Sequence, residues 1–249
     1  MLHLLGSPRG RSQAQSCPHR SSSLTGRITV RASIGLLALA SLLPGRAQAQ
    51  TTTVSMVKDI NTTFLSGQEG NPTHMVRIGS KIYFRAKTTL SGEELWVTNG
   101  TELGTQLVKD ISPGSSSSYI AEMTVVGTKI YFRATNGVDG IELWMSDGTG
   151  AGTAMVKDIH VGSGSSSPKH LCTMNGKLYF SANDNICGYE LWQSDGTAEN
   201  TTLLKDIIPG VSGSAPRGLT VSTNPTSNVS TLFFAAGTSS FPSYPTVLW

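Results

Sequence analysis

The sequence predicts an all-β protein, a β-propeller of four-stranded antiparallel blades with a period of about 48 residues. The first observation is a motif that recurs at a fixed spacing, since Trp96, Trp144 and Trp192 lie 48 residues apart. Self-similarity of this period is typical of repeat architectures. The second is composition: 14% of the residues are charged and 27 are Gly, which suits a turn-rich β protein. The third is that β-branched and aromatic runs alternate with turn signals at about 8–12 residues.

Residues 1–49 have the pattern of an export signal. They contain six Arg residues and no acidic residue, and the apolar run Ile34–Leu43 leads to the small residues Ala47–Ala49. A run of this length is too short for a transmembrane helix, which needs roughly 20 residues. We therefore expect a cleaved signal peptide, with an uncleaved anchor as the alternative, and a secreted or cell-surface protein without a transmembrane segment after cleavage.

The second repeat displays the order of elements within one unit. Four candidate strands follow one another, with a tight turn at Gly127–Thr128 and a second turn at Asp147–Gly152: Glu122–Val126, Lys129–Ala134, Ile141–Ser146 and Thr153–Ile159. Local turns between all four strands predict an up-and-down meander. In the third repeat the first turn is Asn175-Gly176, a strong hairpin signal.

The repeat domain is expected to span residues 50–249. Its predicted blades are 74–111, 122–159, 170–207 and 218–249, preceded by an additional strand at 54–60. The fourth copy lacks the second half of the motif, which leaves two alternatives. The chain is a fragment of a longer array, or the strand 54–60 completes the last blade and closes a ring of four blades, which removes a free sheet edge.

Several residues recur once per repeat, and we interpret them as structural. The Trp residues are expected to pack between neighbouring units, with sugar stacking as the alternative. The Asp-Gly-Thr segments are expected to form turns, with a calcium site as the weaker reading. Extending the register from Ser146 opposite Thr153 predicts that Glu142 pairs with Lys157 across the strands. The structural positions are Trp96, Trp144, Trp192, Trp249, Asp147, Gly148, Thr149, Asp195, Gly196, Thr197, Asp110, Asp158 and Asp206.

The remaining cysteines and histidines give no catalytic or metal signature. Cys172 and Cys187 form an even pair in an oxidising compartment, so they are either a local disulfide or two independent thiols. His74 and His170 occupy equivalent positions at strand starts, which favours a structural or surface role. No zinc-type spacing, phosphate-binding loop or nucleophile elbow occurs. We therefore expect no cofactor and no catalytic residue.

The motif resembles that of the bacterial ELWxxDGT repeat family, on the residues Glu142–Thr149, Gly152–Thr153 and Val156–Ile159. The resemblance covers roughly residues 54–249. It implies an exported protein with a β-propeller-like array of repeats. The first repeat departs from the family pattern at Asn99 and the third at Glu199–Asn200.

Two functions follow as alternatives. The favoured one is a non-catalytic extracellular binding module whose variable connectors present a surface to a protein or glycan: Ser112–Tyr119, His160–Pro168 and Ile208–Pro216. The alternative is a fragment of a secreted propeller hydrolase or lyase that acts on polysaccharide, which needs converging carboxylates. Nucleic acid is not an expected partner, because residues 50–249 hold 13 basic and 16 acidic residues.

Overall fold

The computed structural model describes residues 55–61, 70–238 and 246–249. The predicted export signal at 1–49 and the first residue of the strand expected at 54–60 lie outside the described residues. In the described part, the chain forms strands and no helix, which confirms the all-β prediction.

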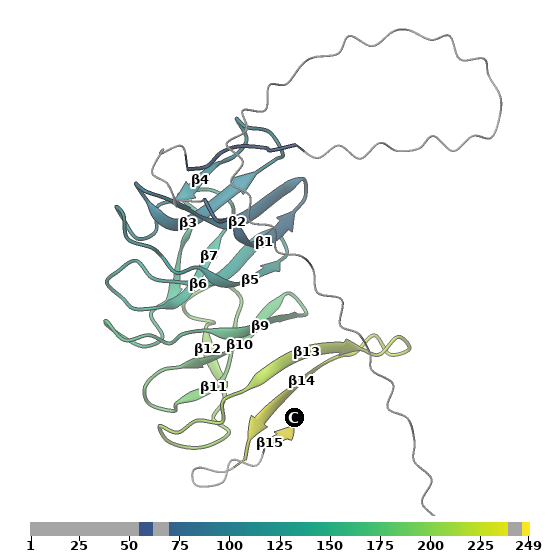
Figure 1. Cartoon of the computed structure of the whole chain (residues 1–249). Coiled ribbons are helices and arrows are strands. Elements are labelled where there is room, and N and C mark those ends of the chain that lie inside the picture. The colour runs from purple at the N-terminus through teal and green to yellow at the C-terminus, as the bar shows by residue number, and fades with distance from the viewer. Residues whose placement is uncertain (1–54, 62–69, 239–245) are drawn as a thin grey trace, which may run out of the picture. The chain divides into compact units, whose positions relative to one another are not determined.

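Four antiparallel sheets follow one another along the chain, each with its strands in sequence order (Figure 1). The first sheet comprises β1 (Thr73–Ile78), β2 (Lys81–Thr88), β3 (Gly92–Thr98) and β4 (Gln106–Lys109). The second comprises β5 (Ala121–Val126), β6 (Lys129–Ala134), β7 (Glu142–Ser146) and β8 (Ala154–Lys157). The third comprises β9 (Lys169–Met174), β10 (Lys177–Asn183), β11 (Tyr189–Ser194) and β12 (Thr202–Lys205). The last has three strands, β13 (Arg217–Thr223), β14 (Ser230–Gly237) and β15 (Thr246–Leu248).

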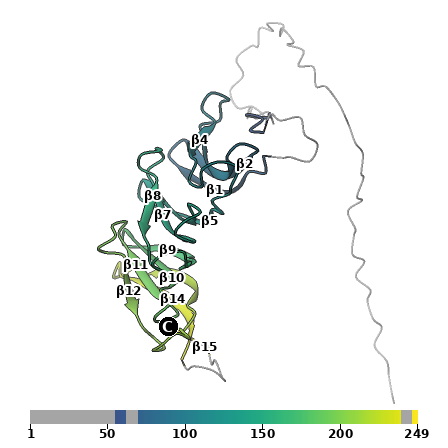
Figure 2. The same ribbon diagram turned by 90° about the vertical axis from the view of Figure 1, so that its left-hand side faces the viewer.

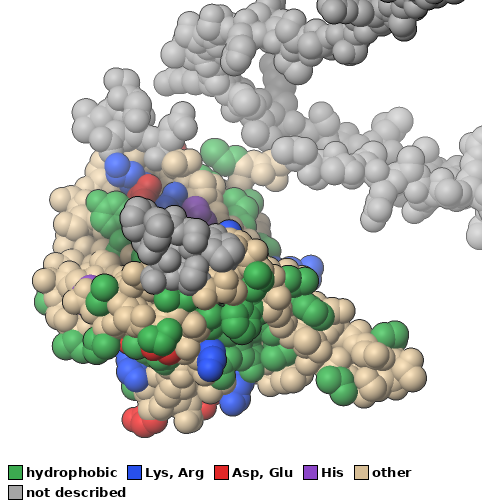
Figure 3. All heavy atoms as spheres, turned by 90° about the horizontal axis from the view of Figure 1, so that it is seen from below, with side chains coloured by type: hydrophobic (Ala, Val, Ile, Leu, Met, Phe, Trp, Pro, Cys, Tyr) green, Lys and Arg blue, Asp and Glu red, His purple; other side chains and the backbone are tan. Residues whose placement is uncertain are grey.

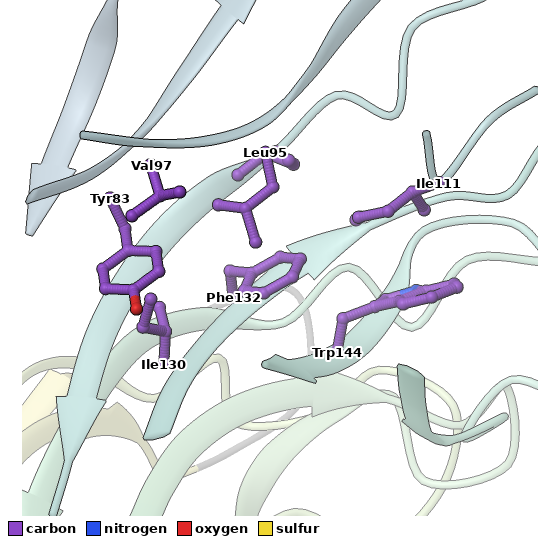
Figure 4. Close-up of a cluster of buried hydrophobic side chains, with 9 residues drawn as sticks. Tyr83, Leu95, Val97, Ile111, Ile130, Phe132 and Trp144 are labelled. Carbon is purple, nitrogen blue, oxygen red and sulfur yellow. The ribbon is translucent and has the colours of Figure 1, made fainter. Parts of the chain in front are cut away.

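The sheets pack against one another through their two faces, because successive side chains of a strand point to opposite faces. Between the first two sheets, Tyr83 and Leu95 of the first meet Phe132 and Trp144 of the second (Figure 4). Phe132 is fully buried, and burial of such a side chain contributes about 1.5–3 kcal/mol. The same pairing of faces recurs between the second and third sheets and between the third and fourth.

The first strand of each sheet lies beside the first strand of the next. Strand β1 neighbours β5, β5 neighbours β9, and β9 neighbours β13, so these four strands form a common edge, which we call the inner edge (Figure 1). Figure 2 shows the same sheets from the side, with β1, β5 and β9 following one another. In the described part of the chain, no close packing of strands joins the first sheet to the last. The structure therefore has blade-like sheets and does not contain a closed ring.

The segment expected as a strand at 54–60 forms no strand in its described residues. It lies against the first sheet, where Ile60 packs on Phe84 and Trp96. The Lys58 Nζ atom donates a hydrogen bond to the Thr105 carbonyl oxygen at 2.9 Å. The last sheet thus has three strands, and the segment does not complete it within this chain.

Candidate functional site

Three of the four repeated tryptophans are buried, Trp144 and Trp192 between sheets and Trp96 on the face of the first sheet where Ile60 packs. Trp96, Trp144 and Trp192 are 6–8% exposed. Trp249 differs, since it is 43% exposed and stacks on Phe234 with ring centroids 6.2 Å apart. The first three positions are therefore closed to sugar stacking, and the fourth indole is partly exposed on the face of the last sheet that packs on the third sheet through Phe234.

The Asp-Gly-Thr segments form the turn between the third and fourth strands of a sheet. The Asp147 Oδ1 atom accepts bonds from the Thr149 backbone N–H at 2.9 Å and from the Thr149 hydroxyl at 2.7 Å. These bonds, that of the hydroxyl first, lower the pKa of Asp147. Gly148 has φ of 90°, and a Cβ atom there would lie 2.2 Å from the hydroxyl oxygen of Tyr83 in the preceding sheet. The turn needs glycine for its backbone and for this close approach.

The repeated glutamate is a buried acceptor that bonds to the segment after its own sheet. Glu142 has no exposed area. Its carboxylate accepts bonds from the Ile159 N–H at 3.0 Å, the Ser166 N–H at 2.8 Å and the Ser166 hydroxyl at 2.5 Å. Burial raises its pKa against the lowering effect of these bonds. In the first repeat, burial raises the pKa of Glu94 to about 7. The carboxylate ties the connector after the fourth strand to the interior of its sheet.

The predicted pair of Glu142 with Lys157 is wrong. The register places Met145 opposite Ala154 as expected, but a bulge follows and Leu143, not Glu142, lies opposite Lys157. A one-residue slip of this kind sends a side chain to the other face of the sheet. The Lys157 ammonium instead donates to the Thr201 carbonyl of the next sheet at 2.8 Å. Lys109 does the same with Thr153 at 2.7 Å, so these lysines join neighbouring sheets.

The repeated aspartates of the fourth strands cap the connectors. The Asp158 Oδ2 atom accepts the Gly162 N–H at 2.9 Å, and Asp110 accepts the Gly114 N–H at 3.3 Å. The second carboxylate oxygen of each of these residues, and of Asp206, is buried without a hydrogen-bond partner among the described residues. One carboxylate oxygen of Asp110 and one of Asp158 are therefore bonded within the fold.

The connectors lie directly on the loop between the second and third strands. Gly140 has φ of 68°, and a Cβ atom there would lie 1.7 Å from the Gly164 carbonyl oxygen. Connector residue Ser118 donates its N–H to the Glu93 carbonyl and accepts the Thr135 N–H of the next sheet. Loops and connectors thus share one side of the sheets, which we call the connector edge. It comprises the loops 88–92, 135–141 and 184–188 and the connectors 112–119, 160–168 and 208–216.

Each loop of the connector edge exposes one large apolar side chain. Leu90, Val138 and Ile186 are 83%, 70% and 71% exposed, and they are 48 residues apart. Stacked sheets lie about 10 Å apart, so the edge presents a row of apolar groups with a regular step. Several exposed apolar side chains in a row are typical of an interaction surface, whereas a single one is common on any protein.

Near the starts of β1, β5 and β9, the same edge carries polar side chains that differ between the repeats. His74, Glu122 and His170 are 48 residues apart and share a left-handed backbone, with φ of 54°, 58° and 56°. Non-glycine residues in this region are strained and occur preferentially at functional sites. The Glu122 carboxylate accepts the His170 N–H at 2.9 Å. Sequence reasoning took the two histidines for structural or surface positions and overlooked Glu122, although the common spacing links all three.

A hollow of about 420 Å³ opens beside these strand starts, lined in part by His74, Glu122 and Arg133. Burial lowers the pKa of His74, and the neighbouring Arg85 lowers it further. The Arg85 guanidinium is 3.7 Å from the Glu93 carboxylate. The hollow can therefore offer the His74 imidazole, the Glu122 carboxylate and the Arg133 guanidinium to one ligand.

The disulfide alternative for Cys172 and Cys187 is wrong, because both thiols are free. Cys172 pairs with Tyr179 in the β9–β10 ladder, whereas Cys187 follows the far end of β10. From Tyr179 to Asn183 the strand rises about 13 Å, and a disulfide needs Cα atoms within about 7 Å. Burial raises the thiol pKa of both residues.

Neither a cluster of metal ligands nor a membrane-spanning helix occurs among the described residues. They contain no group of three or more His, Cys, Asp or Glu side chains that could hold a metal ion. They also contain no helix long and apolar enough to cross a membrane.

Comparison with known proteins gives no family. Neither the known protein families nor the curated proteins contain a match to this chain. Among solved structures, the computationally designed Ika4 protein is similar over 78% of this chain and 98% of its own, with 14% identity and a TM-score of 0.37. Similarity at that level carries no argument about fold or function. The resemblance to the ELWxxDGT repeat family stays a prediction from the motif.

Proposed function

We propose that this chain is a secreted or cell-surface repeat protein without catalytic activity, which binds a protein or a glycan on its connector edge. The observation that carries the proposal is the row of exposed apolar side chains Leu90, Val138 and Ile186 in equivalent loops of the connector edge. A repeated scaffold that holds variable groups on one edge is a common arrangement of binding proteins.

The use of the repeated acids supports a role without catalysis. Glu142 is fully buried and accepts three hydrogen bonds, and Asp147 accepts bonds within its own turn. A glycosidase needs two free carboxyl groups about 5–9.5 Å apart across a substrate. On the connector edge, Glu122 accepts the His170 backbone N–H and Glu93 lies 3.7 Å from the Arg85 guanidinium, so both carboxylates have partners within the fold.

We further infer that the four sheets are blades of a β-propeller and that residues 54–60 supply the fourth strand of a blade made by β13–β15. Two features support this. The segment Met56–Ile60 repeats the sequence of Met155–Ile159. The bond of Lys58 to the Thr105 carbonyl also matches the bonds of Lys109 and Lys157 to the carbonyls of the sheets that follow them.

Binding is tested on a glycan array and by pull-down of extracellular proteins. We expect the triple variant Leu90→Ser, Val138→Ser and Ile186→Ser to bind at least tenfold more weakly, which corresponds to about 1.4 kcal/mol. The control is Leu103→Ser, since Leu103 is 94% exposed in the β3–β4 turn on the opposite side of its sheet. Equal binding by the triple variant and the control would remove the connector edge from the proposal. Turnover of a polysaccharide by the wild-type chain would contradict the non-catalytic role.

A further inference from the structure

The two ends of the series of sheets carry different faces. Between the second and third sheets, the face with Tyr131 and Leu143 meets the face with Phe180 and Trp192. The equivalent faces meet at the other two interfaces between sheets. We call the first kind the trailing face and the second the leading face. Among the described residues, no other sheet packs on the leading face of the first sheet or on the trailing face of the last sheet, so these two faces are complementary.

The trailing face of the last sheet is open. Phe233 lies opposite Thr220 as Tyr131 lies opposite Thr124, so Phe233 and Tyr131 are equivalent. Phe233 is 38% exposed and Leu248 75%, whereas Tyr131 is 2% exposed and Leu143 is fully buried. Both exposed side chains line a hollow of about 560 Å³. Seen from the β13–β15 end, hydrophobic side chains gather over this face (Figure 3).

The leading face of the first sheet is covered only in part by described residues. Ile60 packs on Phe84 and Trp96, and a hollow of about 290 Å³ remains beside it, lined by Val57, Ile60, Met75 and Phe84 among others. The segment lies where the fourth strand of a preceding sheet would lie, because Lys58 makes the bond that Lys109 makes from β4. Phe84 and Trp96 are only 4% and 8% exposed, whereas Met75 of β1 is 60% exposed, so the part of this face that a further sheet can still cover lies over β1.

We propose that a second copy of this chain docks the trailing face of its β13–β15 sheet on the leading face of the first sheet, and that the segment 55–60 pairs with the edge of the second copy's β15. This rests on the proposed blade architecture. The pairing of Leu143 with Lys157 and of Trp144 with Met155 predicts that Leu248 lies opposite Lys58 and Trp249 opposite Met56. Addition of a strand to a free edge satisfies its backbone groups.

A second copy is favoured over closure within one chain. The segment 55–60 already sits on its own first sheet, and the strands of the last sheet do not pack closely on the first in the described residues. In a dimer, the last sheet of each copy docks on the first sheet of the other copy, so two equivalent interfaces form. The product is a ring of eight sheets, within the range of about 4–8 blades known for propellers.

The experiment measures the mass of the purified full chain by analytical ultracentrifugation over a concentration series. We expect a dimer whose dissociation constant rises at least tenfold in Leu248→Asp. Leu103→Asp is the matched control, because Leu103 is 94% exposed and lies outside both faces. A wild-type monomer at every concentration, or equal effects of the two variants, would overturn the proposal.

A crosslink separates pairing between chains from pairing within one chain. Met56→Cys and Trp249→Cys are introduced together into a chain whose three native cysteines are replaced by Ser. Residues directly opposite in an antiparallel pair have Cα atoms about 4.5–5.5 Å apart, within reach of a disulfide. A covalent dimer supports the proposal. An intrachain disulfide in a monomer overturns the proposed dimer but agrees with the proposed blades. Failure to form either the interchain or the intrachain disulfide overturns the dimer and the fourth-strand assignment. Neither result bears on ligand binding by the connector edge.

Discussion

Replacement of the buried Glu142 by Ala tests whether one carboxylate organises each repeat. The side chain accepts three hydrogen bonds from the segment after its own sheet, two from Ser166 and one from Ile159. In the Ala variant these donors lose their acceptor inside a site that has no exposed area at residue 142. The connector 160–168 should then detach from the sheet.

The magnitude follows from the balance of two opposing terms. Hydrogen bonds to a charged group contribute about 1.5–3 kcal/mol each, which for three bonds gives about 4–9 kcal/mol. Burial of the charge opposes this gain, as the raised pKa of Glu142 indicates. We therefore expect Glu142→Ala to lower the free energy of unfolding by about 3–5 kcal/mol, the loss typical of breaking a buried polar network.

Chemical denaturation measures the loss, and hydrogen exchange locates it. We expect faster exchange of the Ile159 and Ser166 amides in Glu142→Ala and an intermediate loss for Glu142→Gln, which keeps one acceptor. The control is Glu199→Ala, because Glu199 is exposed and such changes alter stability by about 0.5 kcal/mol or less. A loss below about 1 kcal/mol with unchanged exchange would refute the organising role of the carboxylate.

Three further predictions concern the same scaffold. Burial raises the pKa of Glu94 from 4.5 to about 7, so the native state binds the proton more tightly than the unfolded chain does. This contribution to stability is lost as pH rises through about 7. Between pH 5 and 8 we expect the free energy of unfolding to fall more in the wild-type chain than in Glu94→Gln, by up to about 3 kcal/mol over the range. Gly140→Ala should lower the free energy of unfolding by more than about 1 kcal/mol, since the new Cβ would meet the Gly164 carbonyl oxygen at 1.7 Å. The control Gly79→Ala should lower it less, because Gly79 shares a positive φ but has open space around it. Equal losses in the two variants would contradict the steric reason. The melting temperature should be the same with and without reductant, because Cys172 and Cys187 are free thiols.

The order of strands could be predicted because it depends on local signals. In each repeat the turn residues separate short apolar runs, and the meander needs no long-range information beyond the period. The strand predicted at Lys129–Ala134 has the bounds of β6. The burial of Trp144 follows from the same reasoning, since an aromatic residue repeated once per unit has to be covered by the neighbouring unit.

The partners of the charged residues could not be predicted from the sequence. The predicted register was correct near Ser146 and failed three residues further on, because the bulge at Leu143 and Trp144 shifts the pairing by one residue. Nothing in the residue types around Leu143 marks that bulge. The true partners of Glu142 and Lys157 lie 17–24 and 44 residues away along the chain, which only the packing of sheets brings together.

The difference between repeated and unlike positions is the clearest guide to function in this chain. Several positions with one residue type in every complete repeat are buried or bonded within the fold, as Glu142 and Trp144 are. The inner-strand position at residues 74, 122, 170 and 218 instead carries His, Glu, His and Gly on the same left-handed backbone. The fold therefore needs the backbone conformation there and not the side chain, so the side chains are free to differ according to what they contact. This separates them from the buried acids and makes them the first residues to change in a search for the ligand.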